Sequence, residues 1–244
     1  MEIKKLKEEI IKQKNSKFKG NIYHYSQVNF AYNSNKIEGS ILTEEQTEAI
    51  YETASFIPKT EALIKLDDII ETKNHFKLFD YIIDNIDKTL SIDMILEMHR
   101  ILKKGTTDED NPLFNVGGFK IAPNIIGAIS ETETTQPKNI ELELNYLLKK
   151  YTQMEDITLE DIIEFHYNFE KIHPFADGNG RIGRIIMFKE CLKNNIIPFI
   201  ILDKNKNFYL RGLKEYKKGK TYLIDTIKYS QDIYEEICNK LLDY

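Results

Sequence analysis

The stretch HPFADGNGRIGR, from His173 to Arg184, combines an imidazole, a carboxylate, an amide, two guanidinium groups and three glycines. Glycines on both sides of Asn179 let the backbone approach a ligand closely. If a helix begins at or just after Gly178 and runs to about Asn194, its free N–H groups and its dipole favour an anion at this end. The stretch therefore predicts a helix whose first turn forms an anion site.

The charged side chains of this stretch indicate which anion would bind. Arg181 and Arg184 are three positions apart, so both project from one helix face and can hold phosphate oxygens in a fork. Asp177 would repel bare phosphate, but it fits beside phosphate if its carboxylate holds Mg²⁺. The imidazole of His173 is suited to accept a hydroxyl proton near neutral pH. The alternative, a helix start with solvated arginines, gives no reason to gather these four residues.

The composition is that of a globular protein, with 41% hydrophobic and 30% charged residues in a chain of 244. The net charge of -5 argues against a general nucleic-acid binder, which would normally carry a basic excess. Two cysteines are too few for a disulfide framework or a zinc cluster. No apolar signal segment opens the chain, and its apolar runs are too short to span a bilayer. We therefore expect a cytoplasmic protein with neither a nucleic-acid nor a membrane partner.

Apolar residues at helical spacing dominate the chain. Thr43 to Gln46 predicts a capping box, and Ser91 is expected to cap a later helix. Only Gly117 to Gly127, with glycines at both ends and a central Pro-Asn, breaks the pattern, and a β-hairpin or an irregular loop fits it equally well. The expected helices cover about 3–11, 43–55, 66–86, 92–102, 137–151, 159–172, 178–194 and two segments between 205 and 242.

These patterns predict a mainly α fold; the helical bundle core with a small β-hairpin flap next to the active site is what the family resemblance described below implies. The expected organisation is a set of N-terminal helices over 1–58, a core over 59–220 and a C-terminal helix over 221–244 packed on the core.

A second short segment, SNKIEG from Ser34 to Gly39, predicts one or two helical turns. Ser34 is a good N-cap and Gly39 suits the position just past the helix end. Glu38 then lies at the negative end of the helix dipole, which is a poor place for a carboxylate. Either Glu38 is solvated, or a cation elsewhere in the fold pairs with it.

The pattern His-x-Phe-x-Asp-Gly-Asn-Gly-Arg-x-x-Arg resembles the Fic-domain signature at every fixed position. LSIDMILEMHRIL resembles the family's helix before the flap, and NFYLRGLKEY resembles the helix that follows the active site. The resemblance therefore covers about residues 30–220. VGGFKIAPNIIGA resembles the flap that docks the target in this family, with Lys120 where arginine is usual. The flap residues implied are Gly118, Phe119, Lys120 and Ile121.

This resemblance implies transfer of AMP from ATP to a Ser, Thr or Tyr hydroxyl of a protein, possibly the protein itself. His173 would take the hydroxyl proton, and Asp177 would hold Mg²⁺ between the phosphates. Phe175 would anchor the loop in the core. The ATP-binding residues implied are Gly178, Asn179, Gly180, Arg181 and Arg184, the last contacting the γ-phosphate.

Ser-x-x-x-Glu-Gly resembles the inhibitory motif of the Fic class with an N-terminal inhibitory helix, here about 34–39. By this resemblance Ser34 and Glu38 belong to the inhibitory motif, and Glu38 pairs with Arg184 and keeps ATP in a non-productive pose. Alternatives remain open: Glu38 could direct removal of AMP, alone or beside transfer, or the protein could be a nucleotide-sensing regulator without catalysis. A homodimer is a possible assembly.

The other histidines are expected to be structural. His24, His75 and His99 lie in helical stretches with no second ligand near them in the sequence. His166 lies two turns before His173 and is expected to make a buried hydrogen bond.

Overall fold

The computed structural model describes residues 2–16, 18–55, 63–124 and 134–242, which form helices joined by turns and irregular segments, and no strand occurs in these ranges. The mainly α prediction is therefore confirmed. In chain order the elements are α1 (Ile3–Ser16), α2 (Ile22–Ile37), α3 (Glu44–Thr53), α4 (Leu66–Asp84), α5 (Ile92–Lys103), the 3-10 turn η1 (Pro137–Asn139), α6 (Ile140–Thr152), α7 (Leu159–Ile172), α8 (Asn179–Lys193), the 3-10 turn η2 (Asp203–Asn205), α9 (Lys206–Glu215) and α10 (Thr221–Leu242).

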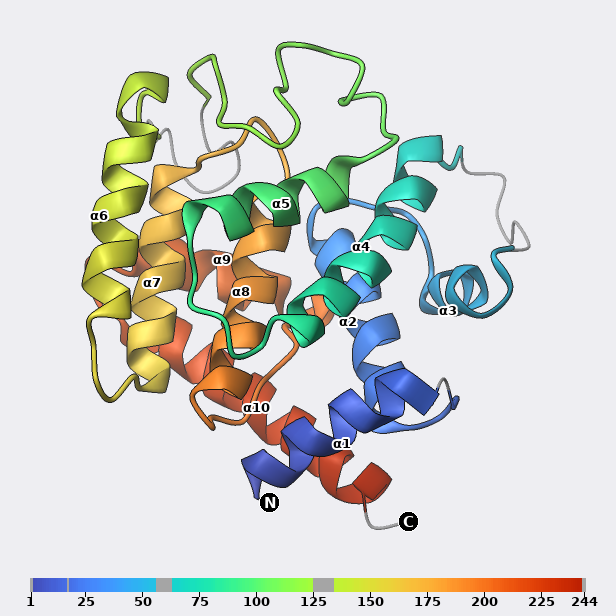
Figure 1. Ribbon diagram of the computed structural model, residues 1–244. Helices are drawn as coiled ribbons and strands as arrows, with labels where there is room; N and C mark the ends of the chain where they lie inside the picture. Colours follow the sequence, from blue (N-terminus) through green and yellow to red (C-terminus); the bar gives the residue numbers. More distant parts are fainter. Residues whose placement is uncertain (1, 17, 56–62, 125–133, 243–244) are drawn as a thin grey trace.

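Helix α8 lies in the middle of this arrangement (Figure 1). Its side chains are buried around the whole helix axis, including Ile182, Ile185 and Phe188. A helix of this kind has to be covered by neighbours on every side. Helix α7 packs on one flank and α2, α4 and α5 pack on the others, so the first turn of α8 lies where several helices meet.

The predicted helix starts are confirmed at two caps. The hydroxyl of Thr43 accepts the Gln46 N–H, and the Gln46 side chain accepts the Thr43 N–H, which makes the expected capping box of α3. Ser91 caps α5 by accepting the Met94 N–H. Local side-chain chemistry therefore sets these two boundaries.

Helix α2 corrects the prediction for the SNKIEG segment. The helix begins at Ile22, where the Asn21 side chain accepts the His24 N–H, so Ser34 lies inside the helix and is not its N-cap. The helix ends as predicted, with Glu38 at the C-cap and Gly39 at a φ of +104°. Glu38 is thus held at the end of a long helix packed on α4 and α8.

The segment predicted as a flap contains turns and bends in residues 117–124. Its remaining residues, 125–127, lie outside the described ranges, so the hairpin is not shown. The Lys120 N–H donates to the Pro174 carbonyl at 2.9 Å, which ties this segment to the loop before α8. The first part of the flap therefore runs beside the signature loop without forming a strand.

Helix α1 and the end of α10 lie on the same side of the molecule (Figure 1). Helix α10 packs on α9 and buries Leu223, Ile227 and Tyr234. No helix in the described ranges combines the length and apolar character needed to cross a membrane.

Candidate active site

The loop between α7 and α8 is held by contacts within the loop and with α5 and α7. His173 ends α7 with a φ of +53°, and its N–H donates to the Phe169 carbonyl at 2.9 Å. Phe175 is completely buried and stacks on His99 with ring centroids 3.9 Å apart. The Asn179 side chain accepts the Phe175 N–H and donates to the Phe175 carbonyl, both at 2.9 Å. Both ends of the Asn179 amide are therefore used to close the loop.

The contacts of His173 leave one of its ring nitrogens without a proton. Its Nδ1 lies 3.3 Å from the Glu170 carbonyl, which can only accept, so Nδ1 carries the proton and Nε2 keeps a lone pair in the neutral ring. Burial, together with the positive charge of Lys120, lowers the pKa of His173 to about 4. The imidazole is therefore neutral at pH 7 and can accept a proton.

Arg184 is held by the end of α2. Its Nη2 donates to Glu38 Oε1 at 2.7 Å and to the Ser34 carbonyl at 3.0 Å, and its Nε donates to Ser34 Oγ at 3.1 Å. The Arg184 side chain is 4% exposed. Burial alone would raise the pKa of Glu38, but the charges of Arg184 and Arg181 outweigh it and hold that pKa below its ordinary value. Glu38 and Arg184 therefore form a charged pair, as the resemblance implies.

The carboxylate of Glu38 also lies over the first turn of α8. A Cβ built on Gly180 would come within 2.3 Å of Glu38 Oε1 and 2.9 Å of Arg184 Nη1. Only a glycine allows this approach without displacing one of the two groups. The carboxylate therefore occupies the place where the start of the helix favours an anion.

Asp177 and Arg181 belong to a second charged cluster. Asp177 Oδ2 accepts from Arg181 Nη2 at 2.8 Å and from Lys103 Nζ at 2.6 Å. Lys103 is almost completely buried and also pairs with Glu71 and Asp108, while Glu71 pairs with Arg181. Burial alone would raise the pKa of Asp177, but Arg181 and Lys103 together hold it far below its ordinary value.

This cluster is suited to a divalent cation. Carboxylate oxygens of Glu71, Asp108 and Asp177 lie within 4.8 Å of one another, and oxygen ligands of this kind are what Mg²⁺ prefers. Asp177 lies nearest the first turn of α8 in the sequence, so it is the residue that would face a bound phosphate. The ammonium of Lys103 already contacts all three carboxylates, so a cation could bind among them only in exchange for some of these contacts.

The expected flap residues differ in what they contact. The Lys120 side chain is buried, and its Nζ donates to Asn124 Oδ1 at 2.7 Å and Thr134 Oγ1 at 2.6 Å. Ile121 is 54% exposed, whereas Phe119 is partly buried against the core. Gly118 lies against Asn115. Lys120 therefore fixes the segment internally, which leaves Ile121 as the side chain that reaches solvent.

The structure brings together all the signature residues and adds others that the sequence did not indicate. Lys103, Glu71 and Asp108 lie outside any motif, and only their contacts with Asp177 and Arg181 reveal them. His166 makes the expected buried hydrogen bond, its Nε2 lying 2.7 Å from the Tyr209 hydroxyl. The Tyr209 ring in turn lies beside the Arg184 guanidinium.

The helical core, with the loop closed by Asn179 and the first turn of α8 at its centre, has the Fic fold. Residues 89–191 match the Fic/DOC family, and the chain therefore contains a Fic domain. A Fic domain containing signaling protein from Bacteroides thetaiotaomicron has the same fold, with a TM-score of 0.76 at 22% identity, covering 94% of each chain. Fic-1 from Caenorhabditis elegans has a TM-score of 0.70 at 18% identity, covering 99% of this chain and 72% of that one.

The curated relatives carry a common name. Protein adenylyltransferase Fic from Nematostella vectensis is 26% identical over 77% of this chain and 43% of its own length. A probable protein adenylyltransferase from Aquifex aeolicus is 30% identical over 44% of this chain and 32% of its own length. The chain thus spans less than half the length of these two relatives.

Proposed function

We propose that this protein is an autoinhibited protein adenylyltransferase, which transfers AMP from ATP to a Ser, Thr or Tyr hydroxyl of a protein and also modifies itself. The observation that carries the proposal is the position of Glu38, whose carboxylate pairs with Arg184 over the first turn of α8. A carboxylate there excludes a phosphate from the same place, both by its charge and by its contact with the arginine. The names of the curated relatives support the same activity.

In the proposed reaction His173 Nε2 accepts the proton of the target hydroxyl. The oxygen then forms a bond to the α-phosphorus as the bond to the pyrophosphate breaks, and the pyrophosphate leaves. The backbone N–H groups at the start of α8 and the Arg181 side chain stabilise the negative charge on the phosphates. Mg²⁺ bound at Asp177 would neutralise phosphate charge. Arg184 can contact the γ-phosphate only after it leaves Glu38.

The test is incubation of ATP labelled at the α-phosphate with the wild-type protein, Glu38→Gly and His173→Ala in a cell lysate. We expect weak labelling by the wild type, stronger labelling by Glu38→Gly and none by His173→Ala. Equal labelling by the wild type and Glu38→Gly would contradict the inhibitory role proposed for Glu38. Full labelling by His173→Ala would remove the role of the base and favour a different chemistry.

Removal of AMP is the second candidate, because the ionised Glu38 carboxylate lies on the same side of α8 as the expected phosphate site and could orient a water there. The two activities separate when protein already labelled with AMP is incubated with wild type and Glu38→Gly. Release by the wild type alone indicates removal, and release by neither leaves transfer as the activity.

A further inference from the structure

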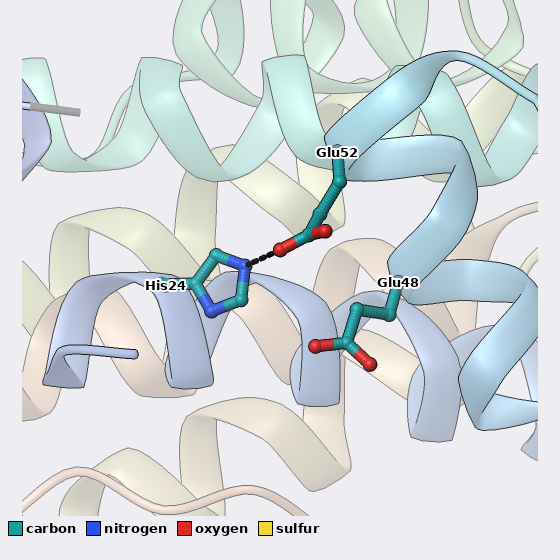
Figure 2. Close-up of side chains that lie close together, drawn as sticks. All are labelled: His24, Glu48 and Glu52. Atoms are coloured by element: carbon teal, nitrogen blue, oxygen red, sulfur yellow. Dashed lines mark ion pairs between the residues drawn. The ribbon is translucent and has the colours of Figure 1, made fainter. Parts of the chain in front are cut away.

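A histidine and two glutamates of the N-terminal helices lie close together (Figure 2). His24 belongs to the first turn of α2, and Glu48 and Glu52 lie one turn apart on α3. One ligand atom from each of the three residues lies within 4.8 Å of the other two. No local sequence pattern connects them, because His24 and Glu48 lie 24 positions apart.

His24 is the anchor of this cluster. The residue is only 8% exposed, and its Nε2 has no hydrogen-bond partner among the described residues. The nearest acidic atom is Glu52 Oε1, 3.5 Å away, which is longer than a good N–H···O bond. Two ligand atoms that share a tetrahedral metal at about 2.0–2.1 Å are roughly 3.3–3.4 Å apart. The separation therefore fits a shared ion better than a direct hydrogen bond.

We propose that His24, Glu48 and Glu52 bind a Zn²⁺ ion, with solvent at the fourth position. An imidazole nitrogen with two carboxylates is a ligand set that suits Zn²⁺, whereas Mg²⁺ and Ca²⁺ take oxygen ligands. Glu48 and Glu52 are exposed at the surface, so the ion has a path from solvent. Three protein ligands and one open position form a complete tetrahedral site.

The electrostatics of α3 favour a cation here. Glu52 lies in the last turn of α3, which contains no basic residue, so the negative end of the helix dipole faces the site. Lys19 Nζ pairs with Glu52 through the other carboxylate oxygen, Oε2, at 2.8 Å. Lys19 is 62% exposed, and surface pairs of this kind contribute about 0–1 kcal/mol, so the ion can compete with it.

Zn²⁺ binding at His24 Nε2 would break one weak hydrogen bond at the other ring nitrogen, Nδ1. His24 Nδ1 accepts the Gly20 N–H at 3.4 Å, and a metal on Nε2 requires the proton to move to Nδ1. A bond of this length is easily given up, and Nδ1 would then be free to donate to water. The occupied site would join α3 to α2, the helix that also carries Ser34 and ends at Glu38.

The test uses the full chain, freed of metal with a chelator and titrated with Zn²⁺ in excess Mg²⁺ and without ATP. The Mg²⁺ saturates sites built only from oxygen, such as the one at Asp177. We expect one equivalent of Zn²⁺ to bind and to raise the Tm. Glu48→Gln, Glu52→Gln and His24→Gln should each weaken binding at least about tenfold. Glu44→Gln, which removes the same charge from the same helix outside the cluster, should bind as the wild type does.

Absence of Zn²⁺ binding by the wild type, or equal weakening by Glu44→Gln, would overturn the proposal. Since His24→Gln could perturb the packing of α2, the visible spectrum of the Co²⁺-loaded wild type provides a second measurement. Bands typical of four-coordinate nitrogen and oxygen ligands that are lost in Glu48→Gln but kept in Glu44→Gln support the site, and a six-coordinate spectrum contradicts it. The outcome does not depend on adenylyltransferase activity.

Discussion

Replacement of Glu38 tests most directly how this structure restrains its own site. Glu38→Gly removes the carboxylate that holds Arg184, and Glu38→Gln keeps the shape but removes the charge. In both variants Arg184 retains its two bonds to Ser34. We therefore expect activation without collapse of this part of the fold.

The expected size of the effect follows from the geometry of the pair. A hydrogen bond between charged groups contributes about 1.5–3 kcal/mol. Arg184 is buried but the Glu38 side chain is 37% exposed, so screening by solvent favours the lower part of that range, about 1.5–2 kcal/mol. This corresponds to a rate increase of about 10- to 30-fold for Glu38→Gly. Glu38→Gln keeps a neutral hydrogen bond and loses about 1 kcal/mol, or about fivefold.

The assay is the initial rate of AMP incorporation from ATP labelled at the α-phosphate, measured at saturating Mg²⁺. Glu236→Gln, which removes an exposed carboxylate from α10, is the matched control and should leave the rate unchanged. Thermal unfolding of each variant shows whether the fold is retained. The reasoning is refuted if all variants have the wild-type rate, or if Glu38→Gln is activated more than Glu38→Gly.

The remaining predictions concern the base, the buried lysine and pH. His173→Ala should lower transfer by about 10²- to 10⁴-fold in the Glu38→Gly background while Tm changes little, measured by the same labelling. Lys103→Met should lower the Tm, because it leaves three carboxylates without the ammonium that pairs with them. Added Mg²⁺ should raise the Tm of this variant more than it raises the Tm of Lys104→Met, a control at an exposed lysine. Burial lowers the pKa of four histidines to about 3 or 4, namely His75, His99, His166 and His173. Unfolding therefore takes up protons below pH 6.5. Each histidine should lower the free energy of unfolding by up to about 1.4 kcal/mol per pH unit as the pH falls from 6.5 toward 4. Burial raises the pKa of Glu170 to about 8 and opposes this loss, so Glu170→Gln should steepen the decline seen in denaturant titrations between pH 7 and 5.

Local patterns were sufficient for most of the helices. The capping box at Thr43 and the cap at Ser91 depend on side chains within three residues of the helix start, and both were predicted from the sequence. The start of α2 was not predicted. Its cap is Asn21 and not Ser34, and the polar residues between these two positions obscure the helical pattern. The buried faces of α2 became clear only from the helices that cover them.

The sequence by itself determined the chemistry of the signature loop. Its glycines, its imidazole and its two arginines lie within twelve consecutive residues, so the local conformation of one loop and one helical turn brings them together. Only the tertiary structure decided which partners those groups have. Packing of α2 on α8 places Glu38 against Arg184, and packing of α4 and α5 places Glu71 and Lys103 around Asp177. Pairings between residues more than thirty positions apart depend on how the helices pack, and local sequence patterns do not indicate this packing.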